Sequence, residues 1–384
     1  MTQTLTKIRP EAALPSSPPR HYKWWRTALE LTILLPLGVL LLEGGFNLAG
    51  VGEEEFLEPD ATLGVRHIAG KKVVWRLEGY SDESFNSAGL RDSEHPISKS
   101  PAVYRVALLG DSATEGMQVP LGDTYGKQME RLLNAGGGLG GKPVEVINFG
   151  CSSYSNGQEL LQLKHQVLAY SPDLVVMMYN RGDYVENIRD PRTLKAEPRP
   201  YFYRDAAGSL QQDNAVMEAN KHLYKRQPLT EFLRKNSRIY GVLSHLNLAL
   251  SLNEPMYAKL KNSLSKKLDR AAAATNASYK QTYPIQDVWQ VTESIVKETG
   301  SICARNGAKF MVVCFPNIVN DNDYKNQIKR LQSLSDPLKY AFADLTYPFM
   351  YSADAKTLFL KYHFSSAGHK LAAEKIAAVC SASK

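Results

Sequence analysis

The sequence has few cysteines, and none of them stands in a spacing typical of a metal site. The four are Cys151, Cys303, Cys314 and Cys380, and no CxxC or CxxxH pair occurs. This pattern gives no support to a zinc site, so we predict neither a bound metal nor a cofactor. Each cysteine is most simply a small buried hydrophobic residue, and a disulfide between two of them is the alternative in an oxidising compartment.

The chain also lacks the concentrated basic patch of a nucleic-acid-binding module. Its formal net charge is +7, but the basic residues are spread out, with modest clusters at 221–227 and 259–270 that suit solvated helix faces. We therefore expect no nucleic acid among its partners, whereas an anionic glycan or lipid surface suits the charge. The glycine-rich residues 136–143 follow a helical pattern and precede a strand. A phosphate-binding loop needs the reverse order, so they predict a turn.

One long apolar run lies near the N-terminus, between segments of opposite charge. The basic residues before it are Lys7, Arg9, Arg20, Lys23 and Arg26, and the acidic residues after it are Glu53, Glu54, Glu55, Glu58 and Asp60. This asymmetry predicts a cytoplasmic tail at 1–27, an uncleaved signal anchor at 28–51, and a main domain that is periplasmic or extracellular. A cleaved signal peptide and a buried core helix are the alternatives. The uninterrupted apolar core, 31–42, is short for a span, but NLAG is a poor cleavage site.

Valine-rich apolar runs predict a parallel sheet. Short continuous runs of this kind are typical of strands buried on both faces, and they occur at 103–110, 144–150, 173–179 and 309–315. Helical patterns alternate with them at 124–134, 159–170 and 287–307. The sequence therefore predicts an α/β protein with a three-layer α/β/α domain at 103–384. Residues 190–285 interrupt the alternation as an insertion, and 52–102 are expected to form an irregular leader.

The first of these runs ends in Gly110-Asp111-Ser112. Ligands of an open parallel sheet bind beyond the carboxyl ends of its strands, so Ser112 stands where a nucleophile would act. The G-x-S-x-G elbow of α/β-hydrolases is disfavoured, because Thr114 occupies the position of its second glycine. The structural alternative is an ordinary turn that N-caps the next helix.

A histidine motif near the C-terminus supplies a base for this serine. His363 opens HFSSAGH (363–369), just before an amphipathic helix. With FNSAGLRD (85–92), YRVALLGDSATEG (104–116) and VINFGCSSYSNGQELL (146–161), it resembles the membrane-anchored bacterial members of the SGNH (GDSL) hydrolase family, over about residues 60 to 380. The resemblance implies an SGNH-like, flavodoxin-like fold, with Ser112 as nucleophile and His363 as general base.

The resemblance also implies an oxyanion hole. In that family the donors are the N–H of the serine, a glycine N–H after the second strand and an asparagine amide after the third. Here these correspond to Ser112, Gly150 and, with a shift of two residues, Asn180. The family reads Gly-Asn-Asp after the third strand, whereas this chain reads Asn180-Arg181-Gly182-Asp183. Arg181 is an alternative donor, and a simple cap of the strand end is the structural alternative for Asn180.

No acidic residue stands where the family carries its triad carboxylate. The family pattern is D-x-x-H, and the two matching positions before His363 are Leu360 and Lys361. Asp354 and Asp344 are the remaining candidates, and a backbone carbonyl would leave a Ser-His dyad. The acidic residues expected to support the site are Asp111, Asp183 and Asp354.

These observations predict a serine esterase or deacylase of the cell envelope. Its substrate would be an acyl ester, above all an O-acetyl ester, of a glycan or lipid. One alternative is an O-acyltransferase for an exported polysaccharide with the same Ser-His chemistry. The other is a catalytically inactive binding or assembly protein, for which the missing carboxylate and the displaced asparagine are the evidence.

Overall fold

The computed structural model describes residues 24–51, 56–76, 78–189, 197–224, 228–243, 288–317 and 321–382. The chain divides into two compact units, Met1–Ala49 and Gly50–Lys384. In the first unit the described residues form helix α1, Trp24–Ala49. Its part Ala28–Ala49 is long and apolar enough to cross a membrane, judged by length and composition. This helix coincides with most of the segment that the sequence predicts to be an anchor.

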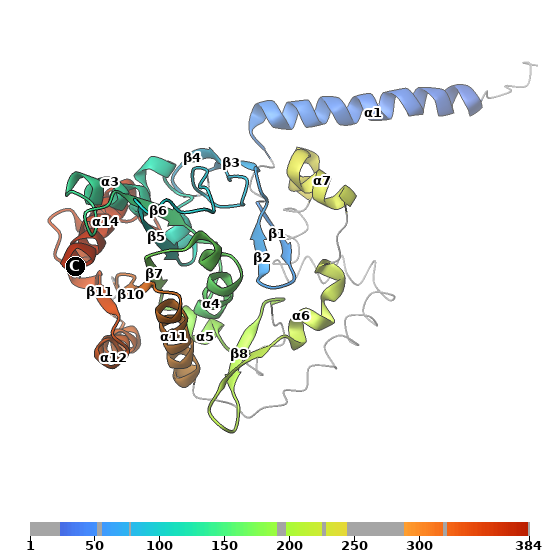
Figure 1. The fold of residues 1–384 in the computed structure, drawn as a ribbon. Helices are drawn as coiled ribbons and strands as arrows, with labels where there is room; N and C mark the ends of the chain where they lie inside the picture. The colour runs from blue at the N-terminus through green and yellow to red at the C-terminus, as the bar shows by residue number, and fades with distance from the viewer. Residues whose placement is uncertain are drawn as a thin grey trace, which may run out of the picture. The chain divides into compact units, whose positions relative to one another are not determined.

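The second unit is built on a parallel sheet of five strands (Figure 1). Four strands fall within the predicted apolar runs: β5 (Tyr104–Leu109), β6 (Val144–Asn148), β7 (Leu174–Tyr179) and β10 (Lys309–Cys314). The fifth, β11 (Ala341–Asp344), was not predicted, because it is short and only partly buried at the sheet edge. The order β11-β10-β7-β5-β6 is the flavodoxin-like order 2-1-3-4-5 when the strands are counted along the chain. The predicted α/β fold class is confirmed.

Helices cover both faces of this sheet and complete the three layers (Figure 1). One face packs against α3 (Tyr125–Ala135) and α14 (Ser366–Ala382). The other packs against α4 (Asn156–His165), α11 (Val288–Arg305) and α12 (Asn322–Leu338). Because both faces are buried, the three central strands β7, β5 and β10 are almost continuously apolar, and their only charged residues, Arg105 and Lys309, stand near the starts of β5 and β10. Shorter helices lie between these elements: α2 (Ser112–Glu115), η1 (Leu121–Asp123), η2 (Val167–Tyr170), α5 (Asp183–Glu186), α13 (Thr346–Met350) and η4 (Ala355–Thr357).

The leader at 52–102, which we expected to be irregular, contains two antiparallel hairpins. They are β1 (Leu57–Asp60) with β2 (Gly64–His67), and β3 (Lys72–Trp75) with β4 (Ser81–Ser84). Each strand has four residues, which is too short for a reliable alternation of apolar and polar positions. The hairpins share a small core of Phe56, Val73, Phe85 and Met117, so the leader packs against the nucleophile loop.

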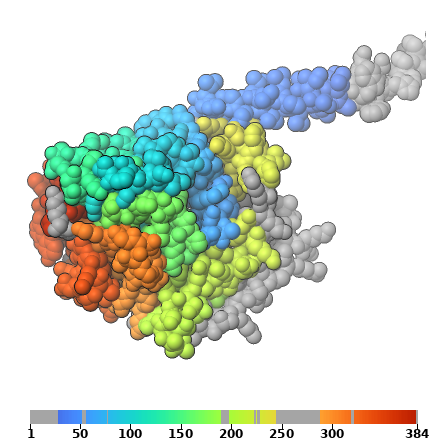
Figure 2. Space-filling model, viewed as in Figure 1, coloured from blue at the N-terminus to red at the C-terminus, as the bar shows by residue number. Residues whose placement is uncertain are grey.

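The described part of the insertion lies between β7 and β10 and is yellow-green in Figure 2. It includes β8 (Tyr201–Arg204), β9 (Leu210–Asp213), α6 (Ala215–Ala219), η3 (Lys221–Tyr224) and α7 (Pro228–Asn236). The rest of the insertion, including the basic cluster at 259–270, lies outside the described residues.

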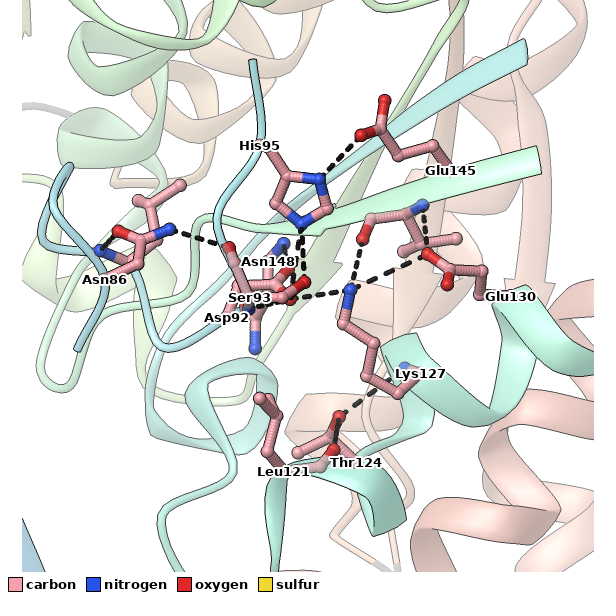
Figure 3. A network of polar contacts seen from close by, with 12 residues as sticks. Asn86, Asp92, Ser93, His95, Leu121, Thr124, Lys127, Glu130, Glu145 and Asn148 are labelled. Atoms are coloured by element: carbon pink, nitrogen blue, oxygen red, sulfur yellow. Dashed lines mark hydrogen bonds and ion pairs between the residues drawn. The ribbon is translucent and has the colours of Figure 1, made fainter. Parts of the chain in front are cut away.

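A polar network joins the segment before β5 to the edge strand β6 (Figure 3). Asp92 accepts from Lys127 Nζ at 2.6 Å and, through its other oxygen, from the backbone N–H of Asn148 at 2.8 Å. His95 Nδ1 lies 2.7 Å from Glu145 Oε1. An edge strand has backbone N–H groups without a strand partner, and Asp92 satisfies one of them. The network therefore fixes the carboxyl end of β6, one side of the candidate site.

Candidate active site

Ser112 lies at the carboxyl end of β5, where the strand order of the sheet reverses. Helix α2 begins at this serine, and Asp111 caps it by accepting the N–H of Ala113 at 2.8 Å. The neighbours of β5 are β6 on one side and β7 on the other. The loops after these strands therefore flank Ser112, at the switch point where open α/β sheets bind their ligands. The turn caps a helix and also presents the serine, so a helix-capping turn and a nucleophile position are compatible interpretations of this motif.

His363 faces Ser112 across a separation of 251 residues in the chain. Its Nε2 lies 2.9 Å from Ser112 Oγ. The histidine stands in the loop before α14, where the N–H of Leu360 donates to its carbonyl at 2.9 Å. The next residue, Phe364, is fully buried and stacks on Phe315. This buried ring anchors the loop, and so the structure places the expected nucleophile and base within hydrogen-bonding distance.

The carboxylate that faces His363 Nδ1 is Glu78, in the loop between β3 and β4. Its Oε2 lies 2.8 Å from Nδ1, and its Oε1 accepts the backbone N–H groups of Tyr362 at 2.6 Å and His363 at 3.0 Å. Burial by itself raises the pKa of Glu78, but these hydrogen bonds outweigh it and leave the pKa below its ordinary value. An ionised carboxylate only accepts hydrogen bonds, so Nδ1 carries the proton. Nε2 is then left to accept from Ser112.

Glu78 takes the place that we expected Asp354 or Asp344 to fill. Asp354 is exposed at the start of η4, and Asp344 accepts the backbone N–H of Thr346 at 2.8 Å. The sequence carries no signal for Glu78 beyond a lone acidic residue beside a glycine, because it precedes His363 by 285 residues. The expectation for Asp354 is therefore corrected by the position of the leader, which packs against the loop of His363.

Asn180 lies close to the nucleophile loop, as the resemblance implied. Its Nδ2 donates to Asp111 Oδ2 at 2.9 Å, and a primary amide has a second N–H to donate. Its backbone N–H donates to Asp183 Oδ2 at 2.7 Å, while its carbonyl accepts the N–H of Asp183 at 3.2 Å. The backbone of Asn180 thus closes the turn between β7 and α5, while its side-chain amide lies against Asp111, the residue before the serine. Arg181, the alternative donor, is mostly exposed and is paired with Asp321 at 2.6 Å.

The two backbone N–H groups that we expected to bind an oxyanion differ in whether they already have an acceptor in this structure. Ser112 is the first residue of α2, so its N–H has no acceptor within the helix. The N–H of Gly150 instead donates to Asn148 Oδ1 at 2.9 Å. Gly150 also packs so closely on α2 that an added Cβ would lie 2.4 Å from the backbone nitrogen of Glu115. Any side chain at this position would therefore displace the nucleophile turn.

Of the expected supporting acids, Asp183 is buried and Asp111, next to the serine in the chain, is half-buried. Burial raises the pKa of Asp111, although hydrogen bonds from Ala113 and Asn180 oppose the shift. Burial together with the nearby carboxyl of Glu159 raises the pKa of Asp183 well above its ordinary value. Both aspartates accept hydrogen bonds from Asn180, and Asp111 also interacts electrostatically with His363, which opposes the rise of its pKa.

The comparisons with known proteins find similar solved structures, whereas no protein-family profile and no curated protein matches the sequence. A protein described as lipolytic and of the G-D-S-L family, from Desulfitobacterium hafniense, has a TM-score of 0.38 and 13% identity, covering 72% of this chain and 98% of its own. An acetylxylan esterase from Geobacillus stearothermophilus has a TM-score of 0.39 and 12% identity, covering 72% and 94%. A GDSL-like lipase from Bacteroides thetaiotaomicron has a TM-score of 0.36 and 12% identity, covering 73% and 89%. The roles of the residues in this chain rest on its own geometry.

The segment FNSAGLRD (85–92) packs against the nucleophile turn and hydrogen-bonds it. Asn86 shapes the turn by accepting the N–H of Ala88 at 3.0 Å. Arg91 is fully buried, and its guanidinium donates to the carbonyls of Glu115 at 3.1 Å and Val119 at 2.6 Å. These bonds hold the carboxyl end of α2 and the loop that follows it. The sequence marks this segment only through the family resemblance, and no local pattern indicates the role of Arg91.

Proposed function

We propose that this chain is a serine hydrolase of ester bonds, with Ser112 as nucleophile, His363 as general base and Glu78 as the orienting carboxylate. One observation carries the proposal: Ser112 Oγ lies 2.9 Å from His363 Nε2, and His363 Nδ1 lies 2.8 Å from Glu78 Oε2. A nucleophile, a base and a carboxylate that orients the base, linked in this order, have the geometry of a catalytic triad.

Hydrolysis at this triad proceeds in two halves. Ser112 Oγ attacks the acyl carbon while its proton passes to His363 Nε2. The bond to the leaving alcohol then breaks, and His363 protonates the departing oxygen. Water attacks the acyl-serine in the same way: it loses a proton to His363, which returns that proton to Oγ as the acid is released. Glu78 stabilises the imidazolium formed in each half.

The oxyanion of each tetrahedral intermediate needs donors in place. The N–H of Ser112 and the second N–H of the Asn180 amide supply two, and such donors contribute about 3 to 4 kcal/mol each. The N–H of Gly150 becomes a third donor when it leaves Asn148 Oδ1 for the oxyanion. This exchange replaces one accepted bond with a stronger one to a charged oxygen.

We further propose that the substrates are O-acyl esters, O-acetyl esters above all, on a glycan or lipid of the cell envelope. The apolar helix at Ala28–Ala49 supports anchoring in a membrane. Basic residues before it and acidic residues after it support a cytoplasmic N-terminus and a domain on the opposite side. The net charge of +7 suits an anionic surface.

Of the two alternatives, an inactive binding protein rested on the missing carboxylate of the D-x-x-H pattern and on the displaced asparagine. The position of Glu78 speaks against the first of these grounds, because it brings a carboxylate to His363 from elsewhere in the chain. An O-acyltransferase shares the first half of the reaction and differs only in that a sugar hydroxyl, in place of water, attacks the acyl-serine.

The test is covalent labelling of the full chain in detergent with a fluorophosphonate, followed by mass spectrometry of the modified peptide. We expect one adduct, on Ser112, that is absent from Ser112→Ala and strongly slowed in His363→Ala. Ser333→Ala, at an exposed serine of α12, serves as the matched control and should label normally. Absence of the adduct in a chain with a normal circular dichroism spectrum contradicts the proposal. Measuring free acetate against transfer to an oligosaccharide then separates hydrolase from transferase.

A further inference from the structure

A second cluster of reactive side chains lies beside the nucleophile turn and takes no part in the proposed hydrolysis. It consists of His67 at the end of β2, Glu115 at the end of α2, and Cys151 in the loop after β6. One ligand atom of each lies within 4.8 Å of the other two, and all three side chains are buried. Imidazole, carboxylate and thiol thus converge on one small volume.

The partners around this cluster fix how its ligand atoms point. His67 Nδ1 lies 2.9 Å from the carbonyl of Gly89, and a carbonyl only accepts, so Nδ1 carries a proton. His67 Nε2 then faces Glu115 Oε1 at 2.5 Å, while the other carboxylate oxygen accepts from Ser152 Oγ. A ring nitrogen lone pair and a carboxylate attract only if a positive charge, either a proton or a metal ion, lies between them. Metal-binding histidines and carboxylates characteristically have outer partners of this kind.

We propose that His67, Glu115 and Cys151 bind a divalent transition-metal ion of the zinc type. Nitrogen, oxygen and sulfur donors together suit zinc, which is commonly four-coordinate. On binding, the metal replaces the proton at His67 Nε2 and releases the thiol proton of Cys151 to solvent. With metal–ligand distances of about 2.1 Å, tetrahedral N and O donors stand about 3.4 Å apart. Loading therefore widens the 2.5 Å contact between His67 and Glu115 by a rotation of the carboxylate.

A cavity beside the cluster supplies the access and the fourth ligand position. It has a volume of about 250 Å³, and both His67 and Cys151 line it. Its other lining residues include the polar side chains of Arg66, Gln162 and His165. A metal ion can enter through this cavity and keep a water molecule on the cavity side. Glu115 does not line the cavity, so its carboxylate would bind the metal ion from the side away from the cavity.

This site contradicts our expectation, based on cysteine spacing alone, that the chain binds no metal. His67 and Glu115 are 48 residues apart, and each ligand comes from a different element of the fold. No local motif therefore records the cluster, and only the packing of the leader against the sheet brings His67 to it.

The experiment is titration of the full chain in detergent with cobalt(II), followed by displacement with zinc. We expect one equivalent of cobalt to produce a thiolate-to-metal charge-transfer band in the near ultraviolet. The band should disappear in Cys151→Ala and persist in Cys303→Ala, a matched control at another buried cysteine. Ser152→Ala removes only an outer partner and should weaken cobalt binding about tenfold or more.

Absence of the thiolate band in the folded wild-type chain overturns the proposal, and so does a band that survives in Cys151→Ala. If Cys151→Ala does not fold, Glu115→Gln and Ser152→Ala take its place, and unchanged affinity in both overturns the proposal equally. The readout is a spectrum of bound metal and needs no substrate. Failure of this site is therefore distinguishable from failure of the proposed esterase, which the labelling of Ser112 tests.

Discussion

Replacing Glu78 by glutamine removes the charge behind His363 and keeps the shape of the side chain. In the wild type, Oε1 accepts two backbone N–H groups, from Tyr362 and His363, and Oε2 accepts from Nδ1. The two backbone donors will hold the glutamine oxygen in the place of Oε1, which turns its NH₂ group toward Nδ1. An NH₂ group donates, so Nδ1 must accept and the ring proton moves to Nε2. With a proton on Nε2, the histidine cannot take the proton of Ser112.

We expect this change to lower kcat by about 10⁴, the cost of losing the acid in a well-defined triad, or about 5.4 kcal/mol of transition-state stabilisation. KM should change little, because Glu78 acts through the histidine and does not contact the acyl group. The assay is the initial rate of 4-nitrophenyl acetate hydrolysis together with the rate of fluorophosphonate labelling. Asp354→Asn is the matched control and should leave both rates unchanged, since Asp354 is exposed away from the ring. A loss below tenfold in Glu78→Gln, or an equal loss in Asp354→Asn, would refute the reasoning.

Two further outcomes follow from the same contacts. Asn180→Ala removes one oxyanion donor and should lower kcat about 10²- to 10³-fold with little change in KM; an unchanged kcat would remove Asn180 from the oxyanion hole. The pKa of Glu78 is lower in the folded chain than its ordinary value of 4.5 in the unfolded chain. The ionised carboxylate therefore stabilises the fold fully at pH values above 4.5. This stabilisation is lost as the pH falls through the lowered pKa of the folded chain. We therefore expect the difference in free energy of unfolding between the wild type and Glu78→Gln, measured in urea, to be constant near neutral pH and to shrink in acid. A difference that does not depend on pH would contradict the ionised state of Glu78.

The sheet was predictable from the sequence because its central strands are buried on both faces. Val106, Ala107 and Leu108 lie on alternating faces yet are all buried. The continuous apolar run therefore predicts a strand by itself, whichever strands pair with it. The edge strand β11 and the four-residue strands of the leader escaped prediction. Short, partly exposed strands owe their conformation to the chain that pairs with them.

The meeting of Ser112 and His363 was predicted from the resemblance of their motifs to those of a known family. The fold accounts for it: each stands at the boundary between a loop and a helix, and these two boundaries lie at one end of the sheet. No such rule applied to Glu78, because nothing local indicates which distant carboxylate completes a triad. The bond from Gly150 to Asn148 was equally hidden, since it depends on a side-chain rotamer that only the packed structure selects.

The triad takes its acid from a hairpin that precedes the sheet and its base from a loop that follows it. Every strand of the five-stranded sheet is therefore synthesised after Glu78 and before His363. A chain released early carries the serine without its histidine, and a chain trimmed back to the start of β5 carries both without the acid. The three side chains can therefore meet only once residues 78–363 have all been made and have folded together.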